Sequence, residues 1–168
     1  MWWRVPRGGK LWEECKGEKN RRTFKRLVTT GKVCGCLAFA GGEPVGWSCV
    51  GPRSDFPRLQ RVRDLQVEWD QDTWVVPCFY IRAAWRKRGV ATALLAGAVK
   101  VAQDHGAREL QGFPVRPHTI PMPAAFAWTG VPRLFEKHRF VPITLPGAKR
   151  DVYSRCLRRR ANRTRQDH

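Results

Sequence analysis

The sequence lacks the features that would place it in a membrane or in two common nucleotide-binding classes. Its 168 residues include no apolar run of about 18, the length of a membrane-spanning helix. Its first residues are not followed by the apolar core of a signal peptide. We therefore expect a cytoplasmic protein with no membrane partner. A Gly-Lys-Ser/Thr phosphate loop is missing, and so is a three-glycine dinucleotide fingerprint.

Cysteine motifs for metal or redox chemistry are missing as well. The six cysteines include one close pair, Cys34-x-Cys36, whose spacing matches neither a zinc knuckle nor a thioredoxin-like motif. This spacing places both thiols on one face of a strand. We therefore expect reduced, mostly buried thiols and no metal.

Acidic residues are scarce. The chain has 14 of them against 32 basic residues, a formal charge of +18 that predicts attraction to polyanions. Arginines are densest between Arg155 and Arg165, and we expect residues 158–168 to be a disordered basic tail; an electrostatic anchor to RNA or DNA is the alternative. No nucleic-acid-binding module or aromatic platform accompanies the tail, so nucleic acid would bind the basic surface and tail only non-specifically.

With 42% hydrophobic residues and eight tryptophans, residues 1–157 can form one domain with its own core. We expect an edge strand at 2–7, one or two surface helices within 13–28, a strand hairpin at 33–40 and 44–50, a long connection at 51–72, and further strands at 108–113, 141–145 and 152–157. Four prolines exclude regular structure from 114–129, and a loop of this length is usually functional.

One stretch organises the rest of the chain. Residues 74–81 form an apolar, β-branched and aromatic run typical of a buried strand. A basic turn follows at 82–88, and after Gly89 apolar residues recur at helical spacing until His105-Gly106 supplies a helix stop. The stretch predicts a strand, a turn and a long amphipathic helix.

The turn is suited to binding phosphate. The first amides of a helix have no partner within it and carry partial positive charge, so an anion can bind at Gly89, Val90, Ala91 and Thr92. Gly89 and Ala91 leave room beside the backbone, while Arg86, Lys87 and Arg88 add charge. We interpret this turn as a pyrophosphate site.

Arg86-Lys87-Arg88-Gly89-Val90-Ala91 resembles the acyl-CoA-binding motif Arg/Gln-x-x-Gly-x-Gly/Ala of the GNAT superfamily of N-acetyltransferases. Residues 131–140 are similar to a later helix of that superfamily, which often ends Leu-Tyr-Glu-Lys-x-Gly-Phe. Leu134, Glu136, Lys137 and Phe140 match. Phe135 stands where tyrosine is common, and Arg139 where glycine is common.

The resemblance implies a mixed α/β (α+β) fold in one domain: a mostly antiparallel sheet of six to seven strands, a central parallel pair that splays apart, and helices on both faces. It also implies acetyl-CoA as co-substrate. The pantetheine arm would pair with the backbone of the central strand while the turn holds the phosphates, so the implied cofactor-binding residues are Phe79, Tyr80, Ile81, Arg86, Lys87, Arg88, Gly89, Val90, Ala91, Thr92 and Phe135.

The catalytic groups are less defined. Backbone N–H groups near Tyr80 and Ile81 could bind the oxyanion, and Glu68, Asp70 or Asp72 could attract the amine or accept its proton, unless these carboxylates only balance local charge. His118 and His138 are weaker candidates. Because a phenyl ring at position 135 cannot donate a proton, Tyr80 or Cys78 would protonate the thiolate, or the thiolate would leave unassisted. Phe126 and Trp128 are candidate acceptor-pocket walls or plain core residues.

Three functions follow. The chain could transfer an acetyl group from acetyl-CoA to a primary amine of a small molecule, peptide or protein. It could instead bind acyl-CoA without turnover. It could also be a basic nucleic-acid-associated protein in which the motif is incidental. The oligomeric state is open, a homodimer included.

Overall fold

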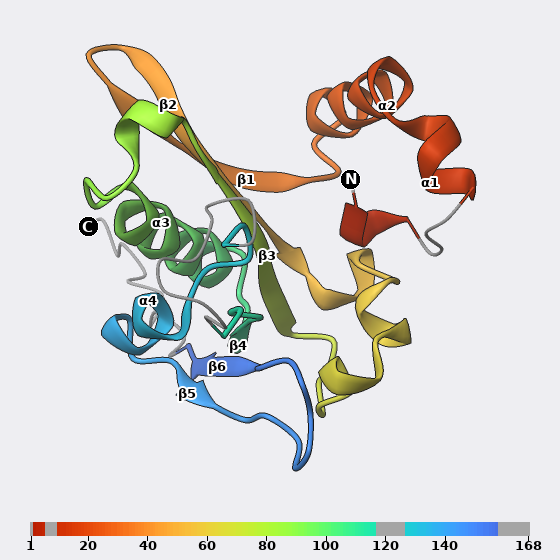
Figure 1. Cartoon of the computed structure of the whole chain (residues 1–168), viewed down its shortest axis with the longest axis vertical. Helices are drawn as coiled ribbons and strands as arrows, with labels where there is room; N and C mark the ends of the chain where they lie inside the picture. The colour runs from red at the N-terminus through yellow and green to blue at the C-terminus, as the bar shows by residue number, and fades with distance from the viewer. Residues whose placement is uncertain (1, 6–9, 117–126, 158–168) are drawn as a thin grey trace, which may run out of the picture.

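The computed structural model describes residues 2–5, 10–116 and 127–157. Within them the chain forms a six-stranded mixed sheet in the order β1-β2-β3-β4-β6-β5, in which β3 and β4 are parallel and all other neighbours antiparallel. Figure 1 shows α3 and α4 on one side of this sheet and α1 and α2 beyond its β1 edge. The basic tail predicted at 158–168 lies outside the described residues.

The elements follow the predicted order closely. The α-helices and strands are α1 (Lys10–Cys15), α2 (Glu18–Thr29), β1 (Cys34–Ala40), β2 (Glu43–Pro52), β3 (Thr73–Ile81), α3 (Val90–Asp104), β4 (Glu109–Gly112), α4 (Pro132–Lys137), β5 (Val141–Pro142) and β6 (Tyr153–Cys156). Short 3-10 helices are η1 (Trp2–Arg4), η2 (Arg53–Asp55), η3 (Leu59–Arg61), η4 (Arg63–Leu65) and η5 (Ala83–Trp85). The mixed fold, the parallel central pair and the β1–β2 hairpin are confirmed.

The N-terminal strand prediction is wrong, because residues 2–4 form the 3-10 helix η1. This turn directs Trp3 into the protein, where its indole N–H donates to the carbonyl of Pro77 at 3.1 Å. The Trp3 ring also stacks on Trp128 at a centroid distance of 5.6 Å. The local sequence pattern does not reveal this long-range contact.

Two apolar clusters sandwich the sheet. On one face, α3 packs against β1, β2 and β3 through residues such as Leu94, Leu95 and Ala98, and α4 adds Leu134 and Phe135 to the same cluster. On the other face, the connection from β2 to β3 folds into η2, η3 and η4 and buries Phe56, Leu59 and Leu65 together with Trp3.

A buried arginine fixes this second layer. Arg53 is only 1% exposed, and it donates to the side-chain oxygen of Gln111 and to the carbonyl of Leu65, each at 2.6 Å. Burial lowers the pKa of this guanidinium to about 10. The side chain joins the β2–β3 connection to β4 and is therefore structural.

The central parallel strands separate at a proline. Between the partner pairs Cys49↔Cys78 and Gly51↔Val75, β3 contains one residue more than β2, which is a β-bulge. Pro77 lies in this bulge and has no N–H to donate to β4. Pairing with β4 ends at Val76↔Gly112, while β3 continues to Ile81 with only β2 beside it. A gap therefore opens along one side of β3.

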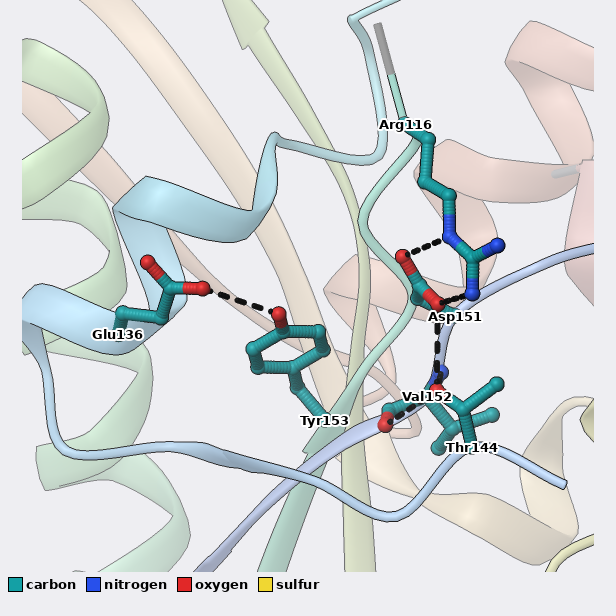
Figure 2. A network of polar contacts seen from close by, with 6 residues as sticks. All are labelled: Arg116, Glu136, Thr144, Asp151, Val152 and Tyr153. Atoms are coloured by element: carbon teal, nitrogen blue, oxygen red, sulfur yellow. Dashed lines mark hydrogen bonds and ion pairs between the residues drawn. The ribbon is translucent and has the colours of Figure 1, made fainter. Parts of the chain in front are cut away.

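Polar contacts attach the C-terminal elements to this frame. The Tyr153 hydroxyl donates to a Glu136 carboxylate oxygen at 3.0 Å and so joins β6 to α4 (Figure 2). Burial, followed by this bond, raises the pKa of Tyr153 to about 12. Beside it, Arg116 pairs with Asp151, and Thr144 bonds to the backbone of Val152. The bond between Tyr153 and Glu136 helps to position α4, which forms one wall of the site described next.

Candidate functional site

The start of α3 is shaped by two left-handed residues. Gly89, at the N-cap, has φ +80°, and Lys87 has φ +58°. The first bond along the helix runs from the Ala93 N–H to the Gly89 carbonyl at 3.1 Å. The amides of the preceding residues in this turn therefore have no acceptor within the helix. Alternating backbone conformations of this kind form concave anion sites.

Gly46 lets this helix start lie directly on the sheet. A Cβ built on Gly46 would stand 2.8 Å from a methyl carbon of Val90 and 3.1 Å from one of Leu94. The first of these contacts is shorter than real Cβ contacts, so any side chain at this position would force α3 and β2 to shift. The close approach places the free amides of α3 beside the C-terminal end of β3.

A cavity of about 780 Å³ opens at this point. Its walls come from the end of β3, from η5 and the start of α3, and from α4 with the residues before it. Its lining residues are Phe79, Tyr80, Ile81, Trp85, Arg86, Lys87, Gly89, Val90, Ala91, Thr92, Ala127, Trp128, Gly130, Val131, Arg133, Leu134 and Lys137. Most predicted cofactor-binding residues are therefore brought together here.

The cavity is positively charged. Arg86 and Lys87 line one side and Arg133 and Lys137 the other, and no described lining residue is an Asp or Glu. Sequence reasoning missed Arg133 and Lys137, although their i, i+4 spacing places both on one side of a helix. Arg88 is not a lining residue, and its guanidinium lies 5.4 Å from the centre of the Trp85 ring.

Along the β3 wall, backbone groups alternate between the sheet and the gap. The Arg82 N–H donates to the Val45 carbonyl at 3.0 Å, so by alternation the Tyr80 amide also faces β2 and those of Phe79 and Ile81 face the gap. The Phe79 N–H donates to the Trp128 carbonyl at 2.7 Å. Ile81 is thus the residue whose amide the strand presents to a ligand.

Tyr80 lies at the cavity edge. Its side chain is 61% exposed, and it projects to the face of β3 opposite Phe79, which packs under α3. The structure therefore gives Tyr80 solvent access but does not aim its hydroxyl into the space below α3.

The predicted acidic residues lie elsewhere. Glu68, Asp70 and Asp72 precede β3, whereas the cavity lies at its far end, roughly 26 Å away along a strand of this length. Asp72 pairs with Arg108 at 3.0 Å, and Glu68 and Asp70 line a separate hollow with Glu109. The structure does not bring these carboxylates to the cavity.

Phe135 is placed differently from what the resemblance implied. Its ring is 0% exposed and is not part of the cavity wall. It contacts Phe79, Phe140 and Tyr153 and fills the space over Gly112, where an added Cβ would stand 2.0 Å from the ring. Phe135 therefore supports the walls from behind and cannot contact a ligand in the cavity directly.

Of the two predicted histidines, His138 lies outside the cavity lining, and His118 lies outside the described residues, as does Phe126. Burial, and then the charge of Arg155, lower the pKa of His138. Trp128 lines the cavity and also stacks on Trp3, and its role as an acceptor-pocket wall stays a prediction.

Within the described ranges, no helix is long and apolar enough to cross a bilayer. Nor do three or more His, Cys, Asp or Glu side chains in these ranges gather into a possible metal site.

A mixed sheet that opens between parallel strands beside a basic helix start is the architecture of acetyl-CoA-dependent acetyltransferases. Residues 2–126 match the model of the acetyltransferase (GNAT) family, and the chain belongs to that family. No curated protein sequence matches the chain.

Several solved structures share the fold. A ribosomal-protein-alanine N-acetyltransferase from Brucella melitensis is 16% identical, with a TM-score of 0.54 over 83% of this chain and 78% of that one. A putative acetyltransferase, yncA, from Salmonella typhimurium, solved with its cofactor acetyl-CoA, is 14% identical, with a TM-score of 0.53 over 84% and 75%. The GNAT domain of S. lividans PAT is 20% identical, with a TM-score of 0.51 over 73% and 60%.

Proposed function

We propose that the protein transfers an acetyl group from acetyl-CoA to a primary amine of a small molecule, peptide or protein. The observation that carries this proposal is the cavity at the start of α3, with four basic lining residues and no acidic one. Coenzyme A presents a pyrophosphate and a 3′-phosphate, and both need such partners. A volume of about 780 Å³ is within the range of small-molecule sites.

The residues divide between two tasks. The amides of Val90, Ala91 and Thr92, with Arg86 and Lys87, would bind the pyrophosphate. The Ile81 N–H would donate to the pantetheine arm that leads from the pyrophosphate and orient this arm, as pairing with a neighbouring strand would. When bound, acetyl-CoA supplies a thioester whose carbonyl an amine can attack.

The amine acceptor must lose a proton before it attacks. Because no carboxylate or histidine is among the described lining residues, we propose that this proton leaves through water at the open cavity edge near Tyr80. The reaction should then quicken with pH as more of the amine becomes neutral.

A second candidate is a GNAT-fold module that binds acyl-CoA without turnover. The same lack of an acidic or histidine side chain in the described lining favours it, as does phenylalanine at position 135. Both candidates require the cofactor, so binding alone does not separate them.

Thiol release does separate them. The protein is mixed with acetyl-CoA and a panel of amines (amino acids, polyamines, and peptides with a free N-terminus or lysine), and free thiol and acetylated amine are both measured. Transfer predicts equal amounts of the two for at least one amine. Tight acetyl-CoA binding without thiol release across the panel would favour the module.

A further inference from the structure

Two free thiols face each other across β2 and β3. Cys49 and Cys78 are direct partners in the strand register, and both belong to or pack against the apolar layer on the face away from α3. Directly opposed residues of antiparallel strands have Cα atoms about 4.5–5.5 Å apart, a separation that a disulfide can span. The two thiols are also close enough to shift each other's pKa.

The two thiols have different acidities. The hydrogen bond from Cys78, and then the nearby Arg4 guanidinium, outweigh burial and lower the pKa of Cys49 to about 7. The same bond, together with burial, raises the pKa of Cys78 well above its usual value. The directions of the two shifts make Cys49 the more acidic thiol of the pair, so we assign it the first reaction with an oxidant.

The other contacts of Arg4 also favour a negative charge at this place. One terminal nitrogen pairs with Asp55 at 2.9 Å, and the guanidinium lies 4.3 Å from the centre of the Phe56 ring. Its Nε and its other terminal nitrogen are buried without a hydrogen-bond partner among the described residues. Buried donors of a cation without a partner are costly. A Cys49 thiolate is an anion that could interact with them.

The pair lies beside the bulge that opens the sheet. Cys78 follows Pro77 and precedes Phe79, whose amide is held by Trp128. A covalent bond here would join β2 to β3 at the point where β3 loses its partner on the other side.

We propose that Cys49 and Cys78 are a modification site, a dithiol that hydroperoxides oxidise reversibly to a cross-strand disulfide. The Cys49 thiolate attacks the peroxide and breaks its O–O bond, which gives a sulfenic acid on Cys49 and an alkoxide, or hydroxide from hydrogen peroxide. This anion takes a proton from solvent water and leaves as an alcohol or as water. The Cys78 sulfur then attacks the Cys49 sulfur, the S–O bond breaks, and the hydroxide released leaves as water with the Cys78 proton. Two electrons pass from the two thiols to the peroxide. The sequence did not indicate this site, because Cys49 and Cys78 lie on separate strands and form no local motif of the Cys34-x-Cys36 kind.

The test is thiol mapping on the full chain. The protein is treated with hydrogen peroxide, remaining thiols are blocked, and a digest is read by mass spectrometry with and without dithiothreitol. The proposal predicts a Cys49–Cys78 cross-linked peptide pair that the reductant removes, and a melting temperature raised by about 4–16 °C in the oxidised protein. The proposal is overturned if Cys49 is oxidised to sulfinic acid without the cross-link, if the cross-link joins other cysteines, or if both thiols stay free while an exposed thiol such as Cys156 is oxidised.

Variants test the roles within the pair. Cys156→Ser is the matched control and should leave the cross-link unchanged, whereas Cys78→Ser should abolish it and leave a sulfenic acid on Cys49. Arg4→Gln should slow formation about two- to three-fold, with partial recovery in Arg4→Lys, since the guanidinium is a secondary cause of the lowered pKa of Cys49. An unchanged rate in Arg4→Gln would show that Arg4 does not promote the oxidation of Cys49.

Discussion

At the scale of single residues, position 135 shows how one side chain can shape a site that it does not touch. The superfamily pattern suggested contact between Phe135 and the cofactor, but the ring is fully buried behind the cavity wall. Gly112 has no side chain, so the ring can pack against β4. The residue is therefore important for the stability of α4 and β4 rather than for chemistry.

We predict that Phe135→Ala lowers the free energy of unfolding by about 3–5 kcal/mol, because it leaves a cavity in a closely packed core. Phe135→Leu, which keeps most of the apolar volume, should lose about 1–2 kcal/mol. Urea unfolding followed by tryptophan fluorescence measures both. A loss below about 1 kcal/mol in the alanine variant would contradict the packing described here.

Tyr153 gives a prediction about pH. Its pKa is raised to about 12 by burial and by the bond to Glu136, so the folded state holds this proton more tightly than the unfolded chain, where tyrosine titrates near about 10. The stabilisation is complete below about pH 10 and is lost as pH rises toward about 12, with a total of about 2–3 kcal/mol.

Comparing Tyr153→Phe with the native sequence isolates this effect. The difference in unfolding free energy between the two proteins should shrink progressively between about pH 10 and 12. A difference that stayed constant over this window, measured by urea unfolding at each pH, would show that Tyr153 titrates normally.

At the scale of elements, the main relation is the contact of α3 with β2. Gly46 permits this contact, and the free amides of the helix start depend on it for their position. Local patterns predict the helix and the strand separately, but not the separation between them.

A double-mutant cycle tests this contact. Gly46→Ala adds a methyl group 2.8 Å from a Val90 methyl and should cost about 1–3 kcal/mol of stability. Val90→Ala removes that methyl, so the two changes together should cost less than the sum of the single changes, by about 0.5–1.5 kcal/mol. Strict additivity in urea unfolding would mean that the helix and strand are not in contact at this position.

Much of the arrangement could be predicted from the sequence where the signal is local. The apolar run of β3, the basic turn with Gly89 and the helical periodicity of α3 predicted one half of the cavity, because these three elements follow one another directly in the sequence. Contacts between residues far apart in sequence could not be predicted in this way. The contact of Trp3 with Pro77, the pairing of Cys49 with Cys78 and the burial of Arg53 join residues far apart in sequence, and only the folded sheet brings them together.

The carboxylates at the start of β3 show the same limit. Glu68 and Asp72 are close to the central strand in sequence, but a strand is long, and they lie at its opposite end from the cavity. A residue that is close in sequence to a functional strand therefore need not lie in the site that this strand helps to form.

At the scale of the whole molecule, charge is unevenly distributed. The chain carries a formal charge of +18, yet one hollow is lined by Glu68, Asp70 and Glu109 with no described basic residue, while the α3 cavity is lined by basic residues and no described acidic one. The overall charge will attract many polyanions at low salt. We propose that recognition of one anion depends on the directed amides and confined geometry of the α3 cavity.

Calorimetric titration with acetyl-CoA on two glutamate variants tests this claim most directly. Gly89 and Gly106 cap opposite ends of α3, with φ of +80° and +79° and no atom within 4 Å of an added Cβ, so glutamate brings the same strain and charge to each. We predict that Gly106→Glu binds acetyl-CoA within about three-fold of the native protein, whereas Gly89→Glu binds at least about 30-fold more weakly, since its carboxylate competes with the pyrophosphate. Equal affinity in the two variants would contradict the placement of the phosphates at the start of α3.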